Sequence, residues 1–250
     1  MADAIMTTRR HDGRAVDELR PLTLTCGWSK YAEGSCIVEA GNTRVFCTAS
    51  IQDGVPGFLR GTGTGWVTGE YGMLPRACSE RSAREAAQGK VGGRTSEIQR
   101  LIGRALRAVT NLEVFGERTL WVDCDVVQGD GGTRCASIVG GYVSLVQAFH
   151  RLRAQGGCEV IPVRGQVAAV SVGIVNHQPV LDLDYVEDKD ALVDMNVVLT
   201  DDKRLVEVQG TAEGEPFDRG QLNELLDLAE KGIEQIMARQ REVLGDLRAE

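Results

Sequence analysis

The residues with the clearest chemical potential are the glycine-rich run Gly129-Asp130-Gly131-Gly132-Thr133-Arg134. This run lies between a strand-like segment, 118–128, and a helix-like segment, 135–152. A glycine-rich turn into a helix lets backbone N–H groups approach an anion, and the helix start adds about half a positive charge. Thr133 contributes a hydroxyl donor, and Arg134 contributes a planar cation that matches two phosphate oxygens. The run therefore predicts either a phosphate cradle or a tight turn whose arginine faces water.

A second candidate is the acidic segment 181–190, which reads LDLDYVEDKD. Carboxylates at the end of a strand commonly hold a metal ion or act as general acids. If the chain is extended over 180–185, Asp182 and Asp184 share one face about 6–7 Å apart, since a strand rises about 3.3 Å per residue. Asp188 approaches Asp182 only if the chain bends between them. The segment predicts either a carboxylate pair that binds Mg²⁺ or donates a proton, or a solvated acidic turn.

Charge is distributed unevenly along the 250 residues, whose net charge is −8. Between residues 60 and 107, nine basic residues stand against four acidic ones, a local charge of +5. From residue 181 onward, nineteen acidic residues face eight basic ones, a local charge of −11. This separation predicts an acidic body with an arginine-rich patch, which is either a solvated face or an anion-binding surface.

Composition excludes several classes of protein. A chain of this length with 42% hydrophobic residues suits one large domain or two small lobes with a shared core. No apolar run approaches the roughly 18 residues that span a bilayer, and the N-terminus lacks a signal-peptide pattern, so we expect a cytoplasmic protein without a membrane partner. The seven cysteines include no CxxC pair, which favours reduced, mostly buried thiols over disulfides or a zinc site.

The elements that must position these residues follow from hydrophobic periodicity. Segments 35–40 and 43–51 are rich in strand-forming residues and flank a Gly-Asn pair, which predicts a hairpin. Segment 53–93 has frequent glycine and arginine without a sustained period, and it predicts irregular structure. Apolar residues at helical spacing predict a helix over 96–109 that begins at a capping box formed by Ser96 and Gln99.

The second half of the chain has a similar order of elements. Segments 166–175 and 179–186 predict another hairpin, 194–200 and 204–210 predict two more strands, and 218–244 predicts a long helix. Strands and helices are thus mixed in both halves. This order predicts an α+β fold with two β-rich lobes and helices packed on the sheets, the lobes forming a pseudo-repeat.

Two further expectations concern the ends of the chain and its surface. Residues 1–9 show no periodicity and predict a loose N-terminal extension, which leaves 10–250 as a single domain. Within the helix 96–109 three arginines recur at spacings of three and four, so they predict one exposed basic stripe. They are Arg100, Arg104 and Arg107.

Seven short strings, in this order along almost the whole chain, are similar to motifs of the ribonuclease PH family. They are RHDGR (10–14), ELRP (18–21), EYGMLPR (70–76), GRTSEIQRLIGR (93–104), GDGGTR (129–134), VDMN (193–196) and EVQGTAEGEPF (207–217). The resemblance implies an α+β fold of the ribosomal protein S5 domain 2-like type. It also implies a phosphate-dependent 3′→5′ exoribonuclease that trims tRNA precursors and other RNA 3′ ends. Such an enzyme releases nucleoside 5′-diphosphates, adds nucleotides in reverse, and works as a homohexameric ring built as a trimer of dimers.

The same resemblance assigns roles to individual residues. The residues implied to bind inorganic phosphate, the co-substrate, are Arg94, Gly132, Thr133 and Arg134. The catalytic pair, which also holds Mg²⁺ if a metal takes part, best matches Asp182 and Asp188, with Asp184, Asp190 and Asp194 as rivals in a shifted register. The arginines implied to bind tRNA are Arg76, Arg81 and Arg84.

Two other functions compete with this one. An inert RNA-binding ring subunit shares the resemblance, but we expect such a subunit to have lost Arg94, Arg134 or the aspartates, and all are present. A small-molecule transferase that binds phosphate is the other alternative. The basic patch over residues 60–107 is larger than a small substrate requires.

Overall fold

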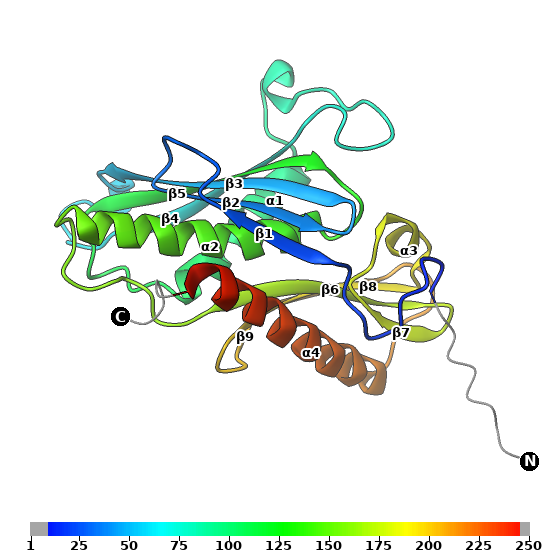
Figure 1. Cartoon of the computed structure of the whole chain (residues 1–250). Helices are drawn as coiled ribbons and strands as arrows, with labels where there is room; N and C mark the ends of the chain where they lie inside the picture. The colour runs from blue at the N-terminus through cyan, green and yellow to red at the C-terminus, as the bar shows by residue number, and fades with distance from the viewer. Residues whose placement is uncertain (1–9, 246–250) are drawn as a thin grey trace, which may run out of the picture.

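Two sheets organise the chain in this computed structural model, which describes residues 10–245 (Figure 1). The expected extension over residues 1–9 lies outside the described residues. The first sheet has the order β1-β2-β3-β5-β4, in which only the β4–β5 pair is parallel. Its strands are β1 (Leu22–Cys26), β2 (Gly34–Ala40), β3 (Thr43–Asp53), β4 (Trp66–Met73) and β5 (Arg118–Gln128). The predicted hairpin is confirmed, because β2 and β3 pair in antiparallel register.

The second sheet is antiparallel, in the order β7-β6-β8-β9. Its strands are β6 (Val167–Val175), β7 (Gln178–Leu181), β8 (Val193–Thr200) and β9 (Leu205–Ala212). Strand β6 reads VAAVSVGIV and is buried along nearly its whole length, because it packs against two helices and pairs with a strand on each side.

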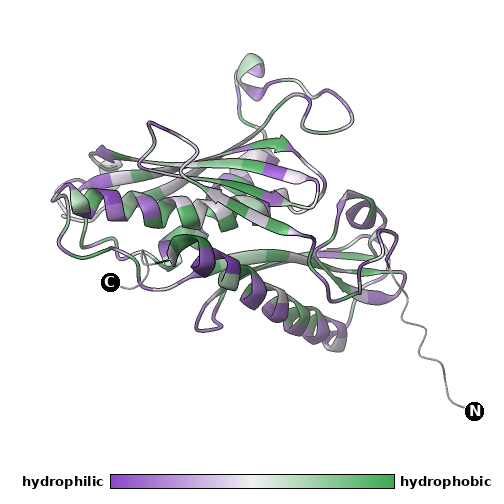
Figure 2. Cartoon of the chain, in the orientation of Figure 1, coloured by the Kyte–Doolittle hydropathy of each residue, from purple (hydrophilic) through white to green (hydrophobic). Residues whose placement is uncertain are grey.

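Helices join the two sheets. They are α1 (Gly93–Ala108), α2 (Thr133–Ala154), α3 (Tyr185–Asp190) and α4 (Arg219–Leu244), with short 3₁₀ turns η1 (Gly57–Leu59) and η2 (Glu85–Gln88). Helix α2 lies between the sheets and contacts both, which explains why most of its residues are buried. Helix α4 packs on β6, β7 and β1 and turns its polar face outward (Figure 2). One hydrophobic core therefore runs through both lobes, as expected for the predicted α+β class.

The sequence missed three elements: β1, β4 and α3. Strand β4 lies inside segment 53–93, so the irregular structure predicted there is only partly correct. Glycines weaken the strand pattern of β4, and the packing requires one of them. A Cβ on Gly69 would lie 2.6 Å from Ile102 Cγ2 of α1. The glycine thus permits the close contact between this edge strand and α1.

The start of α1 also differs from the prediction. The helix begins at Gly93 after the N-cap Gly92, which supplies no side-chain cap. The Ser96 N–H already donates to the Gly92 carbonyl at 3.0 Å, and Gln99 donates to Glu70 Oε2 at 2.5 Å. The predicted Ser96–Gln99 capping box is therefore wrong.

The basic stripe on α1 is only partly exposed. Arg107 donates to the Val67 carbonyl at 2.8 Å and lies over the Trp66 ring, 4.3 Å from its centroid. Burial lowers the pKa of Arg107, with a further contribution from Arg104. Arg104 itself donates from Nε to Glu207 Oε2 at 2.9 Å. Two of the three arginines thus hold β4 and β9 against the helix.

No helix among residues 10–245 is long and apolar enough to cross a membrane.

Candidate active site

A cleft of about 390 Å³ opens where the two lobes meet. The residues that line it come from the β4–α1 loop, the starts of α1 and α2, strands β6 and β8, and α3. They are Met73, Cys78, Arg94, Gly129, Gly131, Gly132, Thr133, Arg134, Ser171, Tyr185, Asp188, Asp194 and Asn196. All four residues predicted to bind phosphate thus face one space, together with one of the two predicted catalytic aspartates.

The turn into α2 is tight because two glycines adopt the left-handed conformation. Gly131 has φ 76° and Gly132 has φ 66°. A Cβ on Gly131 would lie 2.6 Å from the Leu183 carbonyl oxygen, so this turn approaches the backbone just before α3. Gly132 is the N-cap of α2, and no side chain caps the helix. The first N–H groups of α2 are therefore available to an anion in the cleft.

The two residues after the turn are held by other elements. Thr133 Oγ1 and the Tyr71 hydroxyl of β4 are hydrogen-bonded at 2.9 Å. Arg134 Nη1 donates to Gln209 Oε1 of β9 at 2.5 Å and lies 3.5 Å from Glu97 Oε1 of α1. These contacts hold the Arg134 guanidinium at the cleft wall, so the side chain loses little conformational entropy when it binds an anion.

Arg94 supplies a second, freer cation. It is the second residue of α1, its side chain is exposed, and it forms no ion pair within residues 10–245. An unpaired arginine at the cleft mouth keeps its full charge for an anionic ligand. The cleft therefore offers one fixed arginine, one free arginine and the start of α2 to an anion.

Two carboxylates face this positive wall. Asp188 on α3 and Asp194 on β8 are adjacent, and neither has an ion-pair partner among the described residues. Burial raises the pKa of Asp194 to about 6, and the neighbouring Asp188 carboxylate adds to the shift, while Arg134 and Arg94 oppose it. Two like charges at close range share a proton or bind a cation, because both cannot ionise freely.

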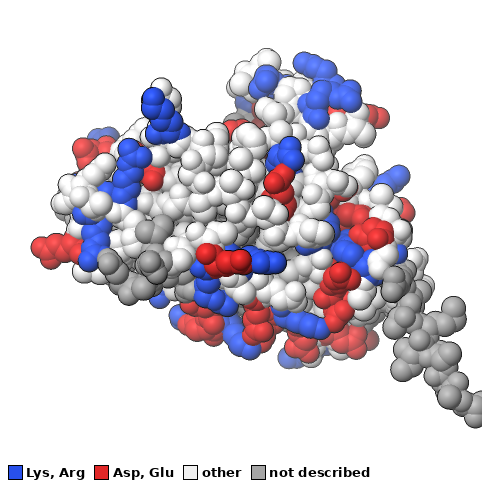
Figure 3. Space-filling model, in the orientation of Figure 1, with Lys and Arg blue, Asp and Glu red and all other residues white. Residues whose placement is uncertain are grey.

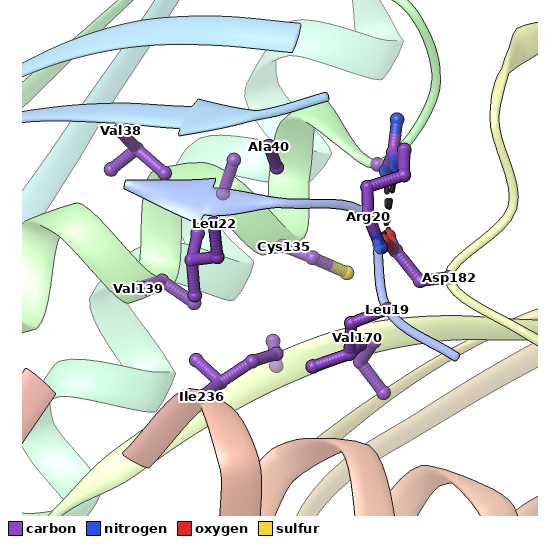
Figure 4. Close-up of a pocket in the computed structure, with 13 residues that line it drawn as sticks. Leu19, Arg20, Leu22, Val38, Ala40, Cys135, Val139, Val170, Asp182 and Ile236 are labelled. Carbon is purple, nitrogen blue, oxygen red and sulfur yellow. Dashed lines mark hydrogen bonds and ion pairs between the residues drawn. The ribbon is translucent and has the colours of Figure 1, made fainter. Parts of the chain in front are cut away.

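Asp182 is placed differently from the prediction. Its backbone is left-handed, with φ 55°, which ends β7 and stops the strand expected to reach residue 186. Arg20 holds its carboxylate through Nε to Oδ2 at 3.0 Å and Nη2 to Oδ1 at 2.6 Å, and the Arg20 N–H donates to Oδ2 at 2.8 Å. Figure 4 shows this pair at the edge of a small apolar cavity lined by β1, β2, α2, β6 and α4.

The expected pairing of Asp182 with Asp188 is thus not observed: the structure pairs Asp188 with Asp194, one of the rivals. Of the other rivals, Asp184 caps α3 through Val186 N–H at 2.9 Å and Glu187 N–H at 3.0 Å. Asp190 lies at a separate hollow beside Arg10. Asp182 does not join Asp188 because Arg20, distant in sequence, already forms an ion pair with the Asp182 carboxylate.

A cluster of His11, Asp184 and Glu187 has ligand atoms close enough to suggest a metal site. The charges around this cluster argue against a metal site. Glu187 is paired with Arg10 and Arg14, and despite burial these hydrogen bonds hold its pKa below the usual range. A carboxylate already neutralised by two arginines is a poor metal ligand, so the cluster fastens the N-terminal segment to α3.

The predicted RNA-binding arginines lie outside the cleft. Arg76, Arg81 and Arg84 are all exposed on the segment between β4 and α1, which projects from the top of the molecule in Figure 1. Figure 3 shows basic side chains gathered on this projection. Cys78, from the same segment, lines the cleft. The projection thus connects a basic surface to the cleft mouth.

Sequence reasoning missed two features of the site. It gave no role to Tyr185, which is 55% exposed and lines the cleft beside Asp188. Nor did it anticipate that Arg20 neutralises Asp182. Arg20 lies in the ELRP string, so the motif was visible, but its partner is 162 positions away.

Comparison with known proteins agrees with the fold and the motifs. Residues 18–149 match domain 1 of the 3′ exoribonuclease family, RNase PH, and residues 165–232 match domain 2. The first match covers β1 to most of α2, and the second covers the second sheet and half of α4. The chain therefore belongs to the 3′ exoribonuclease family, as its resemblance to ribonuclease PH implied.

Solved structures share this fold at low sequence identity. An Archaeoglobus fulgidus exosome with RNA bound to the active site contains a chain that is 22% identical, with a TM-score of 0.79 and coverage of 93% of this chain and 92% of that one. Rrp46 from rice (Oryza sativa) is 18% identical, with a TM-score of 0.76 and coverage of 94% and 100%. A chain of an archaeal exosome core is 21% identical, with a TM-score of 0.74 and coverage of 94% and 90%.

Proposed function

We propose that this protein is a phosphate-dependent 3′→5′ exoribonuclease that trims tRNA precursors and other RNA 3′ ends. The observation that carries the proposal is the layout of the cleft. Arg94, Arg134 and the start of α2 face the carboxylates of Asp188 and Asp194 across one space. A reaction between two anions, inorganic phosphate and an RNA phosphodiester, requires this kind of positive wall beside a proton or cation site.

The chemistry follows from these positions. Arg94, Arg134 and the N–H groups at the start of α2 hold inorganic phosphate. A phosphate oxygen attacks the phosphorus of the terminal nucleotide, and the bond to the 3′ oxygen of the penultimate ribose breaks. The released product is a nucleoside 5′-diphosphate, and the shortened RNA ends in a 3′ hydroxyl. Because one phosphoric linkage replaces another, the reaction also runs in reverse as nucleotide addition.

The leaving 3′ oxygen needs a proton or a positive charge. The raised pKa of Asp194 suits a general acid at that oxygen, with the Asp188 carboxylate beside it. Asp188 and Asp194 also fit Mg²⁺, since both offer hard oxygen ligands and neither has an ion-pair partner among the described residues. Asp182 fits less well, because its carboxylate is already paired with Arg20. A bound Mg²⁺ would supply charge neutralisation at the phosphodiester.

The RNA partner is supported by the surface outside the cleft. Arg76, Arg81 and Arg84 give the projection a charge that suits a polyanion much larger than one nucleotide. Tyr185, exposed beside the carboxylates, offers a flat face for the terminal base. The homohexameric ring belongs to the same proposal, since it rests on the resemblance to ribonuclease PH.

The test is an assay with a tRNA that carries a short 3′ extension, Mg²⁺, and either inorganic phosphate or none. We expect shortening only with phosphate, with nucleoside diphosphates as products. Nucleoside monophosphates released without phosphate would contradict the mechanism. An inert ring subunit would bind the RNA and shorten it under neither condition, and a matched tRNA without an extension tests the preference for precursors.

A further inference from the structure

A row of four cysteines crosses the first sheet. Cys26 of β1 faces Cys36 of β2, Cys36 faces Cys47 of β3, and Cys47 faces Cys124 of β5. Residues directly opposite one another in neighbouring strands share a face of the sheet. Cys36, Cys47 and Cys124 are buried, whereas Cys26 is exposed on the edge strand β1. The row therefore reaches solvent at one end only.

The inner pair has an ordinary explanation as core packing. Cys47 and Cys124 are covered by α2, and both thiols point to the Ser137 carbonyl oxygen, at 3.9 and 3.7 Å. An oxidant has no route to either sulfur. The edge pair differs because Cys26 is accessible, so it can react first while Cys36 remains protected beneath it.

The backbone places the edge pair in the closer of the two antiparallel geometries. The Gly27 N–H donates to the Ser35 carbonyl at 3.0 Å, so Gly27 and Ser35 form a hydrogen-bonded pair. Hydrogen-bonded and non-hydrogen-bonded pairs alternate, which makes the adjacent Cys26–Cys36 pair non-hydrogen-bonded, with Cα atoms about 4.5 Å apart. Disulfides form at Cα separations of about 4.4–6.8 Å, so these two cysteines need little backbone movement.

We infer that Cys26 and Cys36 form an oxidisable thiol pair that closes to a cross-strand disulfide when it meets hydrogen peroxide. The Cys26 thiolate attacks the peroxide oxygen, the O–O bond breaks, and Cys26 becomes a sulfenic acid as water leaves. Cys36 then loses its proton and attacks the Cys26 sulfur, forming the S–S bond and releasing a second water. Two thiols lose two electrons and two protons in total, and one hydrogen peroxide becomes two waters.

The pKa values of the two thiols suit an attacking sulfur at Cys26 and a second, later-reacting sulfur at Cys36. The facing Cys36 thiol lowers the pKa of Cys26 to about 7, despite partial burial, and Gln147 contributes to the shift. The Cys36 thiol itself donates to the Ile37 carbonyl at 3.5 Å, and the Cys26 thiol lies 4.0 Å from the Val243 carbonyl oxygen of α4. The facing Cys26 thiol, together with burial, raises the pKa of Cys36. Cys26 is therefore half thiolate near neutral pH and acts as the attacking sulfur, whereas Cys36 stays protonated until Cys26 is oxidised.

Peptide mapping of the full chain tests this inference directly. Trypsin does not cleave Arg20–Pro21, so Cys26 falls in the peptide 15–30, Cys36 in 31–44 and Cys47 in 45–60. After hydrogen peroxide and alkylation of the remaining thiols, we expect a linked pair, 15–30 with 31–44, that dithiothreitol separates. A link from 31–44 to 45–60, or both edge thiols recovered fully alkylated, would overturn the inference.

Variants separate the two steps. Cys36→Ala should leave a sulfenic acid at Cys26 that dimedone traps, and Cys26→Ser should form no link. Cys78→Ser is the matched control, because Cys78 is exposed but has no facing cysteine in the described residues, and it should leave the link unchanged. In the wild type, iodoacetamide should modify Cys26 at pH 7 about 3-fold to 4-fold faster than an ordinary thiol of pKa about 8.5, because the larger thiolate fraction outweighs the lower nucleophilicity of each thiolate. A link lost in Cys78→Ser, or ordinary Cys26 reactivity, would contradict the inference.

Discussion

At the scale of single residues, the sequence predicted the four residues that line the arginine side of the cleft, and on the acidic side it predicted Asp188 but placed Asp182 rather than Asp194 beside it. Arg94, Gly132, Thr133 and Arg134 belong to short motifs at helix starts, so their local structure already orients them. The aspartates depend on contacts between distant segments. Nothing in the acidic segment itself shows that Arg20 holds Asp182, because that ion pair forms only after β1 and β7 come together.

The raised pKa of Asp194 predicts in which direction the stability of the protein changes with pH. Its raised pKa means that the folded protein binds a proton more tightly than the unfolded chain, so stability falls as pH rises from about 4 to about 6. Asp194→Asn removes this penalty. We expect the variant to be more stable at pH 7 by about 1–2 kcal/mol, since one pKa unit is worth about 1.4 kcal/mol and partial exposure reduces it.

Denaturant unfolding of both proteins at pH 4, 5, 6 and 7 measures this difference. The gap between the two should shrink steadily from pH 7 to pH 4, where the wild-type carboxyl is protonated in the folded protein and partly protonated in the unfolded chain. Activity should be lost at every pH, because the amide neither ionises nor donates a carboxyl proton. A variant that is less stable than the wild type at pH 7 would show that burial and the Asp188 charge do not destabilise the Asp194 carboxylate in the folded protein.

At the scale of elements, the turn before α2 and the helix α3 depend on one another. Gly131 approaches the Leu183 carbonyl and the Asp184 backbone, so the glycine-rich turn and the acidic side of the cleft touch at this point. Hairpin β2–β3 and helices α2 and α4 were predictable because their periodicity is local. Strand β4 and helix α3 were not, because glycine-rich packing and an Asp184 cap replace hydrophobic periodicity there.

Substitution of two glycines separates local strain from loss of the contact between these elements. Gly131 and Gly156 both have φ 76°, but only Gly131 has atoms within 4 Å of an added Cβ. We expect Gly156→Ala to cost about 1–2 kcal/mol of stability and to keep activity. Gly131→Ala should cost more and abolish activity, because α3 and Asp188 must move. Thermal unfolding and the phosphate-dependent assay give both readouts, and equal losses in the two variants would argue against this coupling.

At the scale of the whole molecule, the basic patch predicted from the sequence corresponds to a segment that projects from the surface. The basic residues gather on the projection between β4 and α1, whereas acidic and basic side chains are mixed over the lower face of the molecule (Figure 3). The sequence predicted a patch of this sign but not its projection, because the shape depends on where β4 leaves the first sheet. The basic stripe expected on α1 was partly wrong, because Arg107 packs on the Trp66 ring of β4 and is not fully exposed.

The projection predicts how RNA binding responds to salt. Replacement of Arg76, Arg81 or Arg84 by Ala should weaken tRNA binding and lower the slope of log affinity against log salt by about 0.7–0.9 per lost phosphate contact. Arg239→Ala is the control, because Arg239 is an exposed arginine on α4 within the acidic half of the chain. Filter binding over a range of salt concentrations measures the slopes. Slopes equal to the wild type in all three variants would remove the projection from the RNA path.

The central claim is that inorganic phosphate in the cleft is the attacking group. The most direct test supplies radiolabelled inorganic phosphate to the wild type and to Arg94→Ala, whose side chain is exposed and unpaired in the described residues. The wild type should place one label in the β-phosphate of each released nucleoside diphosphate, with one label for each nucleotide lost from the RNA. Arg94→Ala should need much more phosphate for the same labelling. Unlabelled nucleoside monophosphates, released at a rate independent of phosphate, would contradict the account.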